Sequence, residues 1–123
     1  MSHIAQNLER INVRIAEAAI KANRNPAEVT LVAVSKTFPA ADVLSAIFAG
    51  QRHFGENRVE EALPKMAAVA AGLANVRLAG PPLQWHLIGH VQSRKAKDAI
   101  GAHGGNFSFI HSVDSLKLAQ KLA

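Results

Sequence analysis

The chain has 123 residues, of which 49% are hydrophobic and 19% are charged, a composition that suits one folded domain rather than a disordered segment. It contains no cysteine, which excludes disulfide bonds, a thiolate zinc site and a cysteine nucleophile. Its net charge of +5 favours anionic ligands, but aromatic residues make up only 5%, which leaves few groups to stack on nucleic-acid bases.

The first predicted element is an amphipathic helix over residues 4–22. Ile4, Leu8 and Ile11 begin an apolar stripe at helical spacing, and charged residues occupy the other faces. Residues 29–35 then form a continuous apolar run rich in β-branched side chains. Such a run is typical of a strand that is buried on both faces of a parallel sheet.

The later elements alternate helices with strands. In chain order they are a helix over 39–50, a strand over 52–54, a helix over 56–71 with a kink or break at Pro64, a strand over 84–88, a helix over 93–100, a strand over 107–110 and a helix over 115–122. This alternation predicts an α/β fold with a parallel sheet and right-handed crossovers.

Four βα units allow two architectures. They can form a small open sheet, or they can be half of an eight-stranded (β/α)8 barrel of the TIM type, for which about 250 residues are usual. In the second case both edge strands of the half-barrel are exposed. Because unpaired edges invite pairing with other chains, we expect self-association through them.

Lys36 is the first candidate for chemistry. It directly follows the apolar strand over 29–35, and it shares side-chain parity with Val32 and Val34. Ligands of α/β folds bind at the carboxyl ends of the strands, which is where this amine is placed. Apolar neighbours would lower the pKa of the amine and allow it to attack a carbonyl. The alternative interpretation is a solvated lysine at a strand exit.

Two further segments place polar groups at strand ends. Gly55 would let the backbone approach a ligand, and Asn57 offers a donor and an acceptor, although a helix cap explains Asn57 equally well. His86 and Ile88 share parity on the next strand. His86 and His90 are four residues apart, but on a strand and loop this spacing gives no common face, so we expect no metal pair.

Four segments carry a family resemblance: LVAVSKT at 31–37, GQRHFGENRVEE at 50–61, WHLIGHVQSRK at 85–95 and HSVDS at 111–115. In their order and spacing they resemble the YggS/PROSC family, the pyridoxal phosphate (PLP) homeostasis proteins. The resemblance implies a (β/α)8 barrel like the N-terminal domain of alanine racemase. It also implies PLP held as a Schiff base on Lys36.

The same resemblance implies further properties of the site and of the chain. Asn57, His86 and Ile88 fall in motifs on the PLP side of the barrel, so they are expected to bind the cofactor. The family buffers PLP and delivers it, with PLP-requiring apo-enzymes as possible recipients and no established turnover. Members are about twice as long, so residues 1–123 look like the N-terminal half of such a barrel domain. The late loops that grip the PLP phosphate are missing.

Two alternative functions stay open at this point. One is a fold-related PLP enzyme such as an amino-acid racemase, although the second acid/base is commonly a tyrosine and the chain has none. The other is a small basic nucleic-acid-binding module. The sequence has no long apolar run and no basic start followed by an apolar stretch, so we expect neither membrane insertion nor secretion but a cytoplasmic location.

Overall fold

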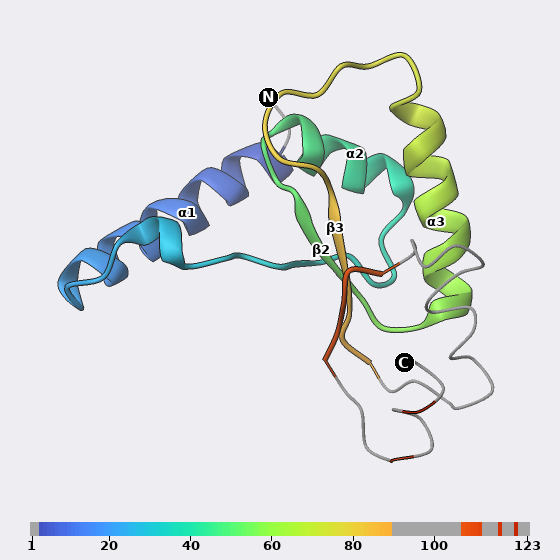
Figure 1. The fold of residues 1–123 in the computed structure, drawn as a ribbon. Coiled ribbons are helices and arrows are strands. Elements are labelled where there is room, and N and C mark those ends of the chain that lie inside the picture. Colours follow the sequence, from blue (N-terminus) through green and yellow to red (C-terminus); the bar gives the residue numbers. More distant parts are fainter. Residues whose placement is uncertain (1–2, 90–106, 112–115, 117–119, 121–123) are drawn as a thin grey trace.

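The computed structural model describes residues 3–89 and 107–111, together with Leu116 and Gln120 (Figure 1). In chain order its elements are α1 (His3–Lys21), the short 3-10 helix η1 (Pro26–Glu28), β1 (Ala33–Val34), α2 (Ala40–Phe48), β2 (His53–Glu56), α3 (Val59–Gly72), β3 (Gln84–Leu87) and β4 (Phe109–Ile110). The predicted helix over 93–100 and most of the one over 115–122 lie outside the described residues.

The four strands form one parallel sheet in the order β1-β2-β3-β4. Their register places Val34 beside Gly55, Gly55 beside His86, and His86 beside Phe109, so one line of partners crosses the whole sheet. Each strand lies next to the strand that follows it in the chain, as in a (β/α)8 barrel. The sheet therefore confirms the predicted α/β class and has the arrangement of a partial barrel.

The first strand is shorter than its apolar run predicts. Only Ala33 and Val34 pair with β2, whereas the prediction covered residues 29–35. Before them, the backbone carbonyl of Leu31 bonds to a side chain: it accepts a hydrogen bond from the side-chain amide of Gln51 at 2.7 Å. The apolar run over 29–35 is therefore longer than the segment that pairs with β2.

The helix α3 starts three residues later than predicted and is not broken at its proline. Glu56 still belongs to β2, where its carbonyl accepts a hydrogen bond from the Ile88 N–H at 2.9 Å. The helix then runs from Val59 to Gly72 with Pro64 inside it. Pro64 is in the second turn, where its missing N–H removes the hydrogen bond to the Glu60 carbonyl, yet the helix continues on both sides of it.

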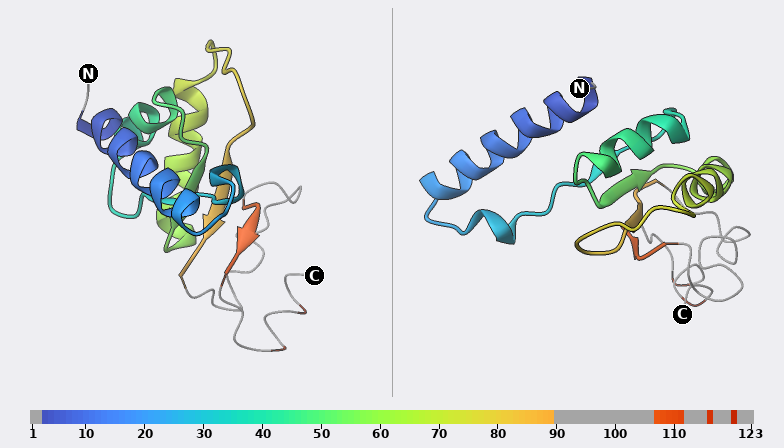
Figure 2. Two further views of the ribbon diagram at one scale, coloured as in Figure 1. Left: turned by 90° about the vertical axis from the view of Figure 1, so that its left-hand side faces the viewer. Right: turned by 90° about the horizontal axis from the view of Figure 1, so that it is seen from above.

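The hydrophobic core lies between one face of the sheet and the helices α2 and α3, which cover that face (Figures 1 and 2). Phe54 from β2 is buried there with Ile47 of α2, and Leu87 from β3 is buried with Val59 of α3. The opposite face carries Val34 and Phe109, which are 49% and 48% exposed, and no described helix covers it. The two faces of the sheet thus differ sharply.

The helix α1 packs against the core through its first half, whereas in its second half Ala19 is buried and α1 also contacts η1. Leu8 is buried and Ile4 packs against the same core, but Ile11, which the apolar stripe placed with them, is 42% exposed. The reason is visible in Figure 2, where the second half of α1, with η1 beside it, extends away from the sheet and from α2 and α3. None of the described helices is long and apolar enough to span a membrane.

Candidate functional site

The sequence-predicted binding residues come to one end of the sheet. Lys36 lies two residues beyond β1, Asn57 directly follows β2, and Ile88 directly follows β3. Because the strands are parallel, these three positions lie at the same carboxyl edge. His86 lies within β3 on the open face of the sheet, as its alternation with the buried Leu87 requires.

Lys36 occupies a tight turn after β1. The N–H of Ser35 still pairs with the carbonyl of Gly55 at 2.9 Å, and the N–H of Phe38 then bonds back to the Ser35 carbonyl at 3.1 Å. The Lys36 side chain is exposed, and no described residue hydrogen-bonds to its amine or forms an ion pair with it. The apolar cover expected from the sequence is therefore not supplied by the described residues.

Beneath this turn lies a buried ion-pair network, which we call the Lys65 cluster (Ser35, Glu56, Glu61 and Lys65). The Lys65 ammonium lies 3.0 Å from both carboxylate oxygens of Glu56, and it donates to the Ser35 carbonyl at 2.6 Å. The Ser35 hydroxyl also bonds to the Glu56 carboxylate. Glu56 is fully buried, and Lys65 and Ser35 are 7% and 6% exposed.

Glu61 connects the Lys65 cluster to the turn. Its carboxylate lies 3.5 Å from the Lys65 ammonium and accepts a hydrogen bond from the Thr37 N–H at 2.5 Å. That backbone hydrogen bond is the main reason why the pKa of Glu61 lies below its ordinary value. Desolvation opposes it, and the charge of Lys65 adds a smaller lowering effect. The turn around Lys36 is thus held from below by charged groups.

Three histidines form a hydrogen-bonded row across the open face. His53 Nδ1 lies 2.9 Å from His86 Nε2, and His86 Nδ1 lies 2.9 Å from His111 Nε2. The His86 ring also stacks on Phe109, with ring centroids 4.4 Å apart. Burial, and then the two neighbouring imidazoles, lower the pKa of His86 below 6.5. Within the described part of the chain no group of histidine and acidic side chains could hold a metal ion.

Two glycines allow the carboxyl edge to pack closely. A Cβ atom at Gly89 would lie 2.1 Å from the Asn57 carbonyl oxygen, so only glycine fits there. A Cβ at Gly55 would lie 3.2 Å from Val32 and 3.3 Å from Ile88. Apolar side chains fill the space over Gly55, which corrects the expectation that this glycine makes room for a ligand.

The capping role considered for Asn57 is wrong. The N-cap of α3 is Arg58, and it makes no side-chain capping hydrogen bond. Asn57 instead sits in the bend between β2 and α3, next to Gly89. Its side chain is half-buried, and it does not cap α3.

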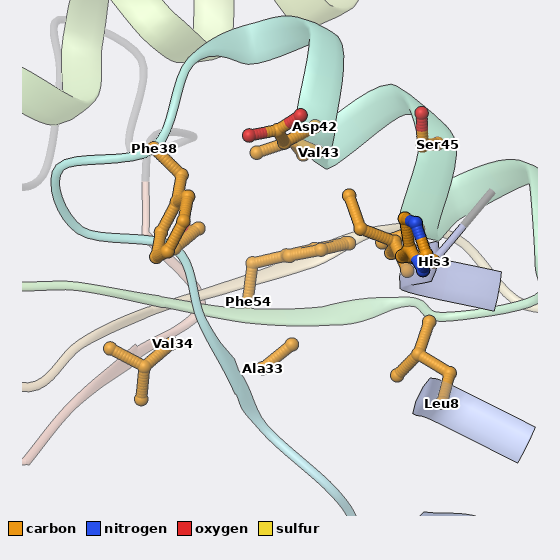
Figure 3. Close-up of a pocket in the computed structure, with 12 residues that line it drawn as sticks. His3, Leu8, Ala33, Val34, Phe38, Asp42, Val43, Ser45 and Phe54 are labelled. Carbon is orange, nitrogen blue, oxygen red and sulfur yellow. The ribbon is translucent and has the colours of Figure 1, made fainter. Parts of the chain in front are cut away.

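A cavity of about 580 Å³ opens between α1, β1 and α2 (Figure 3). Leu8, Ala33 and Val43 contribute to its mainly apolar wall, one from each of these elements. None of the four sequence-predicted binding residues lines it. Val34, Ser35 and Phe38 also line it, so the cavity reaches the carboxyl end of β1 and the turn that carries Lys36.

Sequence reasoning missed the Lys65 cluster and the histidine row. The spacing of Glu61 and Lys65, four residues apart on a helix, was the available signal for the first. For the second, His53 and His86 lie on β2 and β3 and His111 directly follows β4, so each histidine belongs to a different strand or strand end. Only the strand register reveals that they are neighbours.

The chain was compared with protein families and with known proteins. No family model matches it. A pyridoxal phosphate homeostasis protein of Pseudomonas aeruginosa is 50% identical over all 123 residues, which are 48% of that protein. Another from Escherichia coli K12 is 40% identical over 99% of the chain and 48% of the relative. The chain matches the pyridoxal phosphate homeostasis family along its whole length. The resemblance predicted from the four segments is confirmed, and the chain spans about half the length of these relatives.

Solved structures give the same result for the fold. PipY of Synechococcus elongatus, in a structure with PLP bound, is 47% identical with a TM-score of 0.63, over 88% of this chain and 46% of PipY. A protein of unknown function from Bifidobacterium adolescentis is 34% identical with a TM-score of 0.83, over 97% of this chain and 47% of that one.

Proposed function

We propose that the chain binds PLP through the amine of Lys36, as a Schiff base, and that it serves PLP homeostasis without turnover of its own. The observation that carries this proposal is the position of Lys36. Its exposed amine stands at the carboxyl end of the sheet, free of any described partner, in a chain that matches PLP homeostasis proteins. PLP supplies an aldehyde, which a lysine amine can bind covalently.

The other described lysines are poorly suited to this role. Lys65 is buried, and its ammonium is held by two carboxylates and a carbonyl, so it is out of reach of a cofactor. Lys21 lies in the last turn of α1, which is distant from the carboxyl edge (Figure 1). Lys36 is the described lysine whose amine is both accessible and placed where α/β folds bind ligands.

The remaining predicted residues fit different parts of such a site. The half-buried side chain of Asn57 offers a donor and an acceptor beside Lys36 along the carboxyl edge. Ile88 packs over Gly55 and supplies an apolar surface. Both ring nitrogens of His86 are engaged by other histidines, so we propose that it supports the wall of the site and makes no hydrogen bond to PLP itself.

A racemase function is the weaker alternative for these residues. Racemisation needs a second acid/base on the far face of the cofactor, and this chain has no tyrosine to supply it in the usual way. The relatives are named for homeostasis, which agrees with storage and delivery. We therefore propose PLP-requiring apo-enzymes of the cytoplasm as recipients.

A PLP titration followed by visible absorbance tests the proposal. We expect a saturable lysine-bound PLP band with the unchanged chain and with the Lys21→Ala control. The Lys36→Ala variant should lose this band and should retain its far-ultraviolet circular dichroism. Equal bands in the Lys36→Ala and Lys21→Ala variants would overturn the assignment of Lys36.

A further inference from the structure

The residues on both sides of Lys36 are held by the same buried group of charges. On one side, the Ser35 carbonyl accepts a hydrogen bond from the Lys65 ammonium at 2.6 Å. On the other, the Thr37 N–H donates to Glu61 at 2.5 Å, and Glu61 is itself paired with Lys65 at 3.5 Å. The turn that carries Lys36 is therefore attached at both ends to the Lys65 cluster.

The turn needs such an attachment. Thr37 has φ +66°, in the left-handed region that β-branched residues rarely adopt. The backbone N–H of this strained residue is the group that Glu61 binds. A carboxylate acceptor makes a stronger hydrogen bond than a neutral one, so it is well suited to hold an unfavourable conformation in place.

Stability alone is a weak explanation for the Lys65 cluster. Glu56 is fully buried and Lys65 is 7% exposed, and buried ion pairs often add nothing over well-packed apolar residues because both charges lose their hydration. A buried ion pair can, however, hold the elements that carry its two partners in one fixed arrangement. Lys65 reaches from α3 across to β1 and β2 and aligns the ends of these strands.

We propose that Lys65 and Glu61 are positioning residues that fix the turn bearing Lys36 and so direct its amine toward the cofactor. This inference rests on the proposed function, because it assigns the Lys65 cluster to the PLP-binding lysine. Neither residue touches the cofactor in this account. Each acts through the backbone of Ser35 or Thr37.

Glu61→Ala is the variant of choice for the test. Lys65→Met leaves Glu56 buried without its counter-ion and can unfold the chain, whereas the Glu61 side chain is 34% exposed and its loss leaves the Lys65–Glu56 pair intact. Glu60→Ala is the matched control, since Glu60 is the exposed neighbour on the same helix. Glu61→Gln keeps an acceptor for Thr37 and serves as the conservative rescue.

Two readouts separate positioning from folding. Amide hydrogen exchange at Thr37 should speed up about tenfold in Glu61→Ala, the factor that one hydrogen bond of typical net strength represents. PLP labelling of Lys36, fixed by borohydride and measured on the peptide, should fall by about tenfold or more, because small misplacements of a reacting group are costly. Circular dichroism should match Glu60→Ala, and Glu61→Gln should recover most of the labelling.

The outcomes of these experiments separate the positioning role of Glu61 and Lys65 from the proposed binding of PLP by Lys36. Labelling of Lys36 in Glu61→Ala equal to that in Glu60→Ala would overturn the positioning role, even if Thr37 exchange changed. Failure of the unchanged chain to label Lys36 at all would instead overturn the proposed function, and the positioning role with it. Loss of labelling with a preserved fold and partial rescue by Glu61→Gln would support both.

Discussion

Replacing Lys65 by methionine should destabilise the chain severely. Methionine has a similar length and leaves the packing of α3 nearly unchanged, but it removes the charge that compensates Glu56. Glu56 is fully buried and Lys65 nearly so, which puts this pair outside the range of about 0–1 kcal/mol that applies to exposed pairs. Breaking a buried pair by removing one partner costs about 3–5 kcal/mol.

That loss is large beside the total stability of a domain. Folded domains are stable by about 5–15 kcal/mol, so Lys65→Met should remove about a fifth of that stability or more. Equilibrium unfolding in urea, followed by far-ultraviolet circular dichroism, measures the effect. With a slope of about 1–3 kcal/mol per molar urea, the midpoint should fall by about 2 M. Lys21→Met, which changes an exposed lysine at the end of α1, should leave it within about 0.3 M.

A double variant tests the electrostatic cause. Glu56→Gln combined with Lys65→Met removes both charges and keeps an acceptor for the Ser35 hydroxyl. If the unpaired carboxylate is the reason for the loss, the double variant should recover at least half of the lost stability. A single variant within about 1 kcal/mol of the unchanged chain, or a double variant worse than the single, would refute this reasoning.

Three further predictions concern the histidine row, the carboxyl edge and the sheet edges. Because the pKa of His86 is lowered below 6.5 by burial and by its histidine neighbours, the unfolded chain binds more protons, and stability should fall as the pH drops from 7 through this window. The urea midpoint should show this slope, and His86→Gln should reduce it. Gly89→Ala should cost more than about 2 kcal/mol by the same assay, since its Cβ would meet the Asn57 backbone at 2.1 Å, whereas Gly80→Ala, with open space around it, tests strain alone. Sedimentation should detect self-association through the edges of β1 and β4, and a strictly monomeric chain at all concentrations would contradict this.

Local sequence patterns predicted which helices and strands form better than they predicted the residues at which these elements begin and end. The helical stripe starting at Ile4 and Leu8 marked α1 correctly, and the alternation of helices and strands predicted the parallel sheet. The length of β1 could not be predicted, because pairing depends on where its neighbour begins. The exposure of Ile11 likewise depends on how far the rest of the chain reaches along α1.

The site divides in the same way. The position of Lys36 at a strand exit follows from the sequence, because the apolar run over 29–35 ends directly before it. The predicted burial of that strand on both faces is wrong, since Ala33 is half-buried and Val34 is 49% exposed. Lys65 reads as an ordinary helix surface lysine, and only the packing of α3 against the end of β2 shows that it is buried on Glu56. The histidine row needed the register of three strands, which no local pattern contains.

The most direct test of the central claim is to locate the residue that holds PLP. The chain is incubated with PLP, reduced with borohydride and digested, and the modified lysine is identified by mass spectrometry of the peptides. The label should be concentrated on Lys36, with little on Lys21 and none on the buried Lys65. Label spread in similar amounts over Lys21, Lys36 and the other surface lysines would contradict it.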